Sequence, residues 1–195
     1  MKLLIGTNNL NKLKQFKRIL AHHLPEMEVL SLAEVGITDD VEEDGETLLS
    51  NAEKKAKYYA EKSHLPTLSD DTGLFVDALN GEPGLHSKRW HTGNEEESYL
   101  KILERLKNIP EEKRSARYLG ALAFYDPKKK IAWHYEGAIQ GTIANEPRPG
   151  GGFGYDPIFI TQAFNRYYSQ LSPEEIDSIN HRGLGVKELK IFLKK

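Results

Sequence analysis

The stretch KLLIGTNNLNKLKQFKRILAHHLP, residues 2–25, passes from an apolar segment through a polar turn into a helical pattern. Its first apolar run, residues 3–5, has the length and composition of a buried strand. Apolar residues then recur at helical spacing, which predicts a single apolar stripe made of Leu13, Phe16, Leu20 and Leu24. Asn9 or Asn11 is suited to cap the start of this helix, and Pro25 to end it. A strand that leads directly into a helix is the first half of an α/β unit.

Predicted strands and helices alternate along the rest of the chain. Further helices are expected at residues 48–59, 94–106, 172–179 and 185–193. Further strands are expected at residues 28–32, 66–71, 74–76, 117–125, 131–137, 140–143 and 158–160. The strands 117–125 and 131–137 are joined by the turn DPKKK, which is typical of an antiparallel hairpin. We therefore predict an α/β fold whose sheet also contains antiparallel strands.

Length and composition exclude several classes of protein. The 195 residues fit a single domain, which can comprise two lobes and is long enough to bury a core. A total of 27 Lys and Arg against 29 Asp and Glu gives a net charge of −2, which argues against a general binder of nucleic acid or anionic membranes. Cysteine is absent, which excludes disulfides and thiol chemistry. The apolar run at residues 3–5 is too short for a signal peptide or a membrane span, so we expect a cytoplasmic protein.

The turn TNNLNK, residues 7–12, is the first candidate for a binding site. A strand that ends at a helix N-terminus presents backbone N–H groups, Asn amides and the ammonium of Lys12 to one place. Such a place suits an anion, and phosphate fits best. The turn lacks the glycines of the known phosphate-binding and dinucleotide-binding fingerprints. The alternative is an ordinary Asn-capped helix with a solvated lysine.

An acidic cluster precedes the second helix. Glu42, Glu43 and Asp44 stand before Gly45. Mg²⁺ prefers carboxylate oxygens and keeps several waters, so one or two of these residues would suffice beside a substrate phosphate. The alternative is that the cluster complements the dipole of the helix that follows.

Asp70 and Asp71 form a second acidic pair, placed after a short apolar run and before Gly73. Successive side chains of a strand point to opposite faces, so we expect only one of the two to take part in chemistry. A carboxylate near a metal and a phosphate can accept a proton from water. The alternative is a turn in which both carboxylates cap backbone N–H groups.

Two later segments could contact a nucleotide base. GGGFGYDP, residues 150–157, combines a backbone that can approach a ligand closely with the flat faces of Phe153 and Tyr155. NHRG, residues 180–183, offers hydrogen-bond donors from an Asn, a His and an Arg. The alternatives are a plain hairpin loop and solvated side chains.

The order of these motifs is more specific than any one of them. The chain contains TNNxxK, then ExxG with NAxxKA, LSDDTG with PGxxSxRW, GGFGYDPIF and finally HRG. With this order, the chain closely resembles the ITPase-like (Ham1 type) family of noncanonical purine nucleoside triphosphate pyrophosphatases, from residue 3 to about residue 190.

The resemblance implies an elongated α/β fold, in which a long mixed sheet is flanked by two lobes with the nucleotide in the cleft between them. It also implies a homodimer and a divalent metal, which is Mg²⁺ or else Mn²⁺. The implied reaction is hydrolysis of ITP, dITP or XTP to the monophosphate and pyrophosphate. The implied partner is therefore a nucleoside triphosphate, and neither nucleic acid nor a membrane.

The resemblance assigns the reactive acids residue by residue. Asp71 matches the residue that binds metal and accepts the proton, and Asp70 matches its supporting neighbour. The family's other metal ligand falls on Glu42 or Glu43, and the resemblance does not decide between them.

The resemblance also assigns the substrate contacts. Lys12 and Lys55 match lysines that face the phosphates and act in catalysis. The other implied contacts are Thr7, Asn8, Asn9, Thr72, Ser87, Arg89, Phe153, Gly154, Tyr155, Asp156, His181 and Arg182. The last two read the base, because a donor pairs with the C6 carbonyl of hypoxanthine or xanthine and not with the amine of adenine.

Three residues depart from the family pattern. Ile176 stands where many relatives carry a substrate-contacting lysine, Asn180 replaces a serine, and Gln15 replaces a glutamate. The lost lysine removes one positive charge, for which Arg166 or Lys187 could compensate. Two rivals stay open. One is a Maf-like pyrophosphatase for other modified nucleotides, against which the GGFGYDP and HRG elements argue. The other, motivated by Ile176, is a catalytically weakened nucleotide-binding protein.

Overall fold

The structure, a computed structural model, describes residues 1–87, 90, 94–148 and 153–194. The α-helices in these ranges are α1 (Leu10–His23), α2 (Leu48–Ser63), α3 (Glu95–Leu106), α4 (Pro173–Ile179) and α5 (His181–Leu193). The strands are β1 (Lys2–Ile5), β2 (Glu28–Ser31), β3 (Thr67–Val76), β4 (Ser115–Asp126), β5 (Ile131–Ile143), β6 (Phe159–Thr161) and β7 (Arg166–Tyr167). None of the described helices combines the length and the apolar character that a membrane crossing requires.

The strands form one mixed sheet in the order β2-β1-β3-β4-β5-β6-β7. β1 lies parallel to β2 and β3, whereas β6 lies antiparallel to β5 and β7. This confirms the predicted α/β class. The chain divides into two compact units: unit 1 comprises Met1–Asp71, Gly120–Gly137 and His181–Lys195, and unit 2 comprises Thr72–Leu119 and Ala138–Asn180. Each unit is described on its own.

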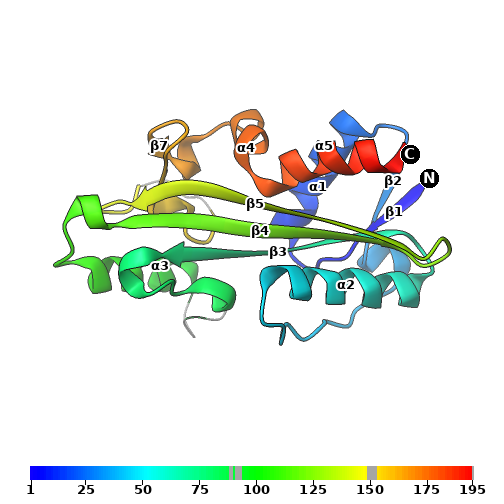
Figure 1. The fold of residues 1–195 in the computed structure, drawn as a ribbon, viewed down its shortest axis with the longest axis horizontal. Coiled ribbons are helices and arrows are strands. Elements are labelled where there is room, and N and C mark those ends of the chain that lie inside the picture. The colour runs from blue at the N-terminus through cyan, green and yellow to red at the C-terminus, as the bar shows by residue number, and fades with distance from the viewer. Residues whose placement is uncertain (88–89, 91–93, 149–152, 195) are drawn as a thin grey trace. The chain divides into compact units, whose positions relative to one another are not determined.

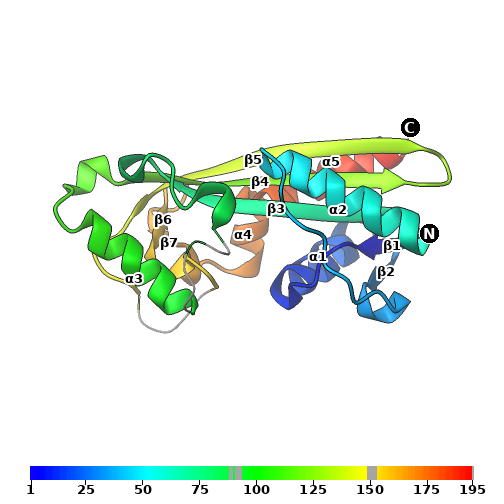
Figure 2. The same cartoon turned by 90° about the horizontal axis from the view of Figure 1, so that it is seen from below.

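Unit 1 buries both faces of its parallel strands, because consecutive residues of β1 point to opposite sides. Leu3 and Ile5 pack in one cluster with Phe16 of α1 and with residues of α5. Leu4, between them, packs in another cluster with Tyr59 of α2. Figure 1 shows α1 and α5 above these strands and α2 below them, and Figure 2 shows α2 on the near side.

The helices α1 and α2 of unit 1 both begin at polar N-cap residues. The side chain of Asn9 accepts hydrogen bonds from the backbone N–H groups of Asn11 and Lys12, at 2.9 and 3.1 Å. Of the two candidate caps, Asn9 is therefore the one used. Thr47 and Ser50 form a reciprocal capping box at the start of α2. These caps fix where Lys12 lies on α1 and where the buried face of α2 begins.

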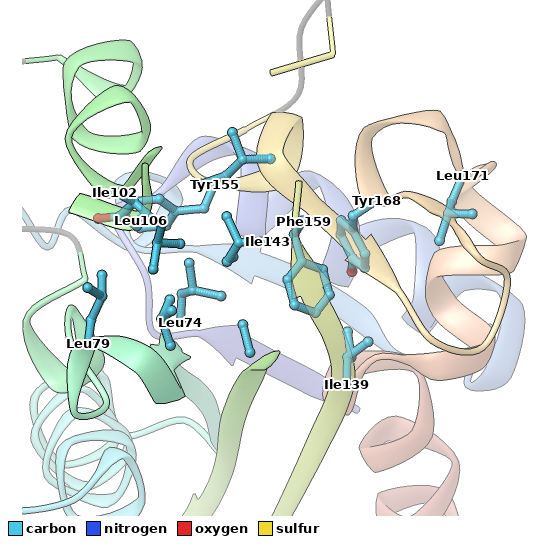
Figure 3. Packing of buried hydrophobic residues seen from close by; sticks show 13 residues of the cluster. Leu74, Leu79, Ile102, Leu106, Ile139, Ile143, Tyr155, Phe159, Tyr168 and Leu171 are labelled. Carbon is cyan, nitrogen blue, oxygen red and sulfur yellow. The ribbon is translucent and has the colours of Figure 1, made fainter. Parts of the chain in front are cut away.

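Unit 2 has its own apolar core. Figure 3 shows side chains from β3, α3, β5 and β6 meeting there, with the labelled residues Leu74, Leu79, Ile102, Leu106, Ile139, Ile143, Tyr155, Phe159, Tyr168 and Leu171. The glycine of SDDTG has a steric role at its edge, since a Cβ on Gly73 would lie 2.4 Å from the carbonyl oxygen of Gly84. Only glycine lets β3 pass this close to the backbone of that turn.

Four features of the secondary structure differ from the prediction. The strands expected at residues 66–71 and 74–76 are one continuous strand, β3. The strands 131–137 and 140–143 are one continuous strand, β5, because Gly137 serves close packing against His181 and does not break the strand. The sequence NHRG is not a loop, since α5 already begins at His181 and only Asn180, with extended ψ 158°, separates it from α4. The strand β7 was not predicted, because two residues carry no periodic pattern.

Candidate active site

Asp70 and Asp71 are both buried on β3 and have different partners. Asp70, 1% exposed, contacts side chains from α1 and from the start of α5. Asp71, 7% exposed, contacts side chains of α2. The strand pleat therefore directs the two carboxylates as predicted, to separate sets of partners.

Three basic side chains lie around one carboxylate oxygen of Asp70. Its Oδ2 accepts hydrogen bonds from Nη2 and Nε of Arg182, at 2.6 and 3.0 Å. The ammonium of Lys12 lies 3.3 Å from the same oxygen, and Nε2 of His181 lies 3.4 Å from it. Burial alone would raise the pKa of Asp70, but the charges of Arg182 and Lys12 outweigh it and hold that pKa well below its usual value. Asp70 is therefore ionised and acts as a counter-ion.

His181 is the neutral member of this group. Burial, followed by the charge of Arg182, lowers the pKa of His181 to about 4. Because an ionised Asp70 can only accept, the proton of the neutral ring is placed on Nε2. The ring fits against β4 because residue 120 is glycine: a Cβ on Gly120 would lie 2.3 Å from Nδ1 of His181.

Asp71 belongs to a second group, which includes a predicted metal ligand. Its Oδ2 accepts a hydrogen bond from Nδ2 of Asn51 at 3.0 Å, and its Oδ1 lies 3.6 Å from the ammonium of Lys55. That ammonium also donates to Glu43 at 2.6 Å. Burial, the largest influence, raises the pKa of Asp71 despite the nearby charges of Lys55 and Lys12. Of the two candidate glutamates, Glu43 is in contact with this group, whereas the side chain of Glu42 is exposed.

Asn51 is not among the site residues that the family resemblance names, but it stands four residues before Lys55, a helical spacing which predicts that both can face one ligand. The Asn51 side chain is 2% exposed and bridges two parts of the site. Its carbonyl oxygen accepts a hydrogen bond from the backbone N–H of Gly45 at 2.8 Å, so its amide nitrogen faces Asp71. The glycine of EEDG permits this approach, because a Cβ there would lie 2.6 Å from the Asn51 oxygen. The NAxxKA motif was the available signal.

The polar turn after β1 is held by its own side chains. Thr7 accepts a hydrogen bond from the backbone N–H of Asn9 at 3.2 Å, and Asn9 caps α1. The amide of Asn8 donates to the backbone carbonyl of Asp39 at 3.4 Å. The turn thus leads directly to Lys12, and its predicted role as a phosphate site stays a prediction.

The remaining predicted residues belong to unit 2. Ser87 accepts a hydrogen bond from the backbone N–H of Leu74 at 2.8 Å and donates to a carbonyl at 2.6 Å, so its hydroxyl supports a turn. Phe153 is 38% exposed, whereas Tyr155 is 6% exposed, which makes Phe153 the accessible aromatic face. Thr72 follows Asp71 on β3. Gly154 and Asp156 lie in the same turn as Phe153, and Arg89 lies outside the described residues.

The three departures from the family pattern have structural counterparts. Gln15 accepts a hydrogen bond from Nη1 of Arg182 at 3.0 Å, so a neutral side chain supports the arginine here. Asn180 is buried at the end of α4. Ile176 packs against the apolar core of unit 2, and Arg166 is paired with Glu175.

Residues 3–192 match the Ham1 family. The chain belongs to this family. Among its relatives, the dITP/XTP pyrophosphatase of Leuconostoc mesenteroides is 37% identical, with 97% of this chain and 94% of the relative covered. The HAM1 protein of Coxiella burnetii has a similar fold with a TM-score of 0.86 at 33% identity, covering 100% of this chain and 98% of the other. The Staphylococcus aureus Ham1 protein gives a TM-score of 0.85 at 33% identity, with the same coverage.

Neutralising Asp70 should destabilise this Ham1 protein. We expect Asp70→Asn to lower the free energy of unfolding by about 3–5 kcal/mol, because the buried cations of Lys12 and Arg182 lose their counter-ion. The quantity is measured by urea denaturation at neutral pH.

The neighbouring carboxylate supplies the matched control. We expect Asp71→Asn to change the free energy of unfolding by no more than about 1 kcal/mol, or to raise it, since burial disfavours the charge of Asp71 and Lys55 keeps Glu43 as a partner. Equal losses in the two variants would contradict the separate roles of the two acids.

The stability of the protein should depend on the protonation of His181. The pKa of this imidazole is about 4 in the folded protein, against about 6.5 in an unfolded chain. The unfolded state binds more protons between these values, so this contribution to stability is lost as the pH falls below about 6.5. We expect wild type to lose about 2 kcal/mol more than His181→Gln between pH 7 and 5, measured by urea denaturation. Parallel pH profiles would refute the assignment.

Proposed function

We propose that this chain hydrolyses noncanonical purine nucleoside triphosphates, namely ITP, dITP and XTP, to the monophosphate and pyrophosphate. Such a reaction removes deaminated purines from the nucleotide pool. Membership of the Ham1 family supports the proposal, as does the full-length similarity to proteins named dITP/XTP pyrophosphatases. The proposal further takes the protein to be a cytoplasmic homodimer built from a single domain with two lobes.

One observation carries the chemical part of the proposal. Glu43 and Asp71, from separate segments of unit 1, converge on the ammonium of Lys55. Two carboxylates around one ammonium group form a site whose negative charge stabilises a cation. A triphosphate with a divalent ion requires this kind of alternation of acidic and basic groups.

The side chains of this place suit a hard divalent ion. Mg²⁺, or Mn²⁺ in its place, takes carboxylate oxygens, and Glu43 and Asp71 provide them with Glu42 nearby in the sequence. In the described part of the chain, no three His, Asp or Glu side chains are grouped so as to hold a metal ion. Glu43 and Asp71 would hold the ion, and substrate phosphates and water would supply its other ligands. When bound, it would offset charge that develops on the phosphates.

Asp71 is the proposed proton acceptor. Burial raises the pKa of Asp71, which makes its carboxylate a better base than an exposed one. The amide of Asn51 holds one of its oxygens, so the carboxylate has a fixed direction. In the proposal, Asp71 removes a proton from a water that attacks the α-phosphorus, opposite the departing pyrophosphate.

Lys12 and Lys55 are the proposed phosphate contacts. Lys12 is placed on the first turn of α1, where the helix dipole also favours an anion, while the Asn9 side chain accepts from the N–H groups of Asn11 and Lys12. Lys55 is already ionised, because neighbouring carboxylates raise its pKa against the effect of burial. Two ammonium groups and the start of a helix together suit the roughly four negative charges of a triphosphate.

Recognition of the base is proposed for three residues. Phe153 offers an exposed face for stacking. The proton of the His181 ring is directed to Asp70, so Arg182 is assigned the hydrogen bond to the C6 carbonyl, and His181 supports it. A site that offers a donor there disfavours adenine, since the amine leaves that donor unpaired.

A nucleotide panel tests the proposed reaction. With Mg²⁺, we expect ITP, dITP and XTP to be converted to monophosphate and pyrophosphate at least about tenfold faster than ATP, because adenine lacks the C6 carbonyl, and also faster than GTP, which differs from ITP by its 2-amino group. Products are separated by chromatography. Binding without turnover would favour a weakened nucleotide-binding protein, and preferred turnover of a modified pyrimidine would favour a Maf-like enzyme.

Replacement of Asp71 tests its role as the base. We expect Asp71→Asn to reduce kcat by about 10²–10⁴-fold while nucleotide binding stays measurable, since the amide cannot accept the proton. Turnover is followed by pyrophosphate release, and binding by calorimetry. Wild-type turnover in this variant would remove Asp71 from the mechanism.

A further inference from the structure

The turn Phe153–Asp156 of unit 2 is closed by the Asp156 side chain. Oδ2 of Asp156 accepts a hydrogen bond from the backbone N–H of Phe153 at 3.3 Å. The backbone N–H of Asp156 donates in return to the carbonyl of Phe153 at 3.2 Å. Gly154, between them, has φ +61°, a conformation that favours glycine. The direction of Phe153 therefore depends on where the Asp156 carboxylate is held.

The second oxygen of this carboxylate is held by Tyr118 of β4. The hydroxyl of Tyr118 donates to Oδ1 of Asp156 at 3.0 Å. The two residues are 38 positions apart in the chain, so this bond ties the turn to the sheet. Burial and the charge of Asp156 raise the pKa of Tyr118 well above its ordinary value, which keeps the hydroxyl protonated and able to donate.

The ring of Tyr118 has a fixed position. It meets Phe159 edge to face at 4.8 Å between ring centroids, and lies tilted against Tyr168 at 5.7 Å. Both of these partners belong to the core of unit 2, where Figure 3 shows them side by side. A ring packed in this way places its hydroxyl without further loss of side-chain freedom.

Two other bonds leave Phe153 as the part of the turn that faces solvent. The hydroxyl of Tyr155 donates to the carbonyl of Ser87 at 2.7 Å, which turns this ring inward. The backbone N–H of Gly154 donates to Glu95 at 2.8 Å. The Asp156 carboxylate is the anchor closest to Phe153, because it bonds the backbone of that residue directly.

We propose that Tyr118 is a positioning residue for recognition of the purine base: its hydroxyl holds Asp156, and through it the turn that presents Phe153. This rests on the proposed function, which assigns the base to Phe153. Tyr118 does not touch the reacting phosphates in this scheme. Its loss should therefore weaken binding of the base and spare the chemical step.

Tyr118→Phe tests this role, since it keeps the packed ring and removes only the hydroxyl. We expect KM for ITP and XTP to rise about tenfold, the effect of one lost hydrogen bond to a charged group, and kcat to change less than about twofold. The inhibition constant for inorganic tripolyphosphate, which has no base, should stay unchanged. A general structural defect would instead weaken tripolyphosphate binding and lower kcat as well.

Tyr99→Phe is the matched control, because the Tyr99 hydroxyl bonds to Glu96 within α3 and not to the turn. We expect its KM for ITP to equal that of wild type. A double-mutant cycle supplies the second test: in an Asp156→Ala background, Tyr118→Phe should raise KM no further.

The outcomes separate this inference from the proposed function. If wild type hydrolyses ITP and Tyr118→Phe has the same KM, the positioning role is wrong and the proposed function stands. Additive effects of Tyr118→Phe and Asp156→Ala would also refute it. If wild type neither binds nor hydrolyses purine triphosphates, the proposed function fails and the inference fails with it.

Discussion

The alternation of side chains along β3 is the constraint on which the site of unit 1 depends. Asp70 and Asp71 are consecutive on an extended strand, so their side chains point to opposite faces and accept hydrogen bonds from different residues. One meets the start of α5 and Lys12, and the other meets α2. The helices that pack against β3 have to place cationic or hydrogen-bond donor groups next to these two carboxylates. A buried carboxylate without such groups is strongly unfavourable. The placement of Lys12, Lys55 and Asn51 follows from this requirement.

The two acids differ chemically because their surroundings differ in charge. Asp70 has Arg182 and Lys12 against it, and these charges lower its pKa in spite of burial. Asp71 is paired with Lys55, which also pairs with Glu43, and burial outweighs the charges of Lys55 and Lys12, so the pKa of Asp71 is raised. One strand can therefore carry a carboxylate that stays ionised as a counter-ion and next to it a carboxylate of raised pKa that is a stronger base. In unit 2, Asp156 is used in a third way, as a link between a turn and the sheet.

Local patterns in the sequence were sufficient to predict several elements of the fold and part of the candidate site. The helical period of 3.6 residues predicts the buried face of α2, and the strand period of 2 predicts that Asp70 and Asp71 diverge. The start of α1 is predicted by the Asn residues that precede it. All three signals come from residues close together in the sequence. Contacts between distant residues carry no such period. His181 reaches Asp70 across 111 positions, and its fit depends on the missing side chain of Gly120, so neither could be predicted. The role of Tyr118 was missed for the same reason, whereas the helical spacing of Asn51 and Lys55 does predict that both lie on one side of α2. The length of β5 was missed because a glycine such as Gly137 is also typical of a strand end.

The low pKa of His181 has a consequence for the charge of the site in unit 1. Histidine ordinarily changes charge near neutral pH, but this one stays neutral from about pH 5 upward, since its pKa is about 4. The net charge that it shares with Asp70, Lys12 and Arg182 is therefore nearly the same at pH 5 as at pH 7. The charge of this group of side chains would thus stay constant over a pH range in which the folded state loses stability, because the unfolded chain binds a proton that the buried ring does not.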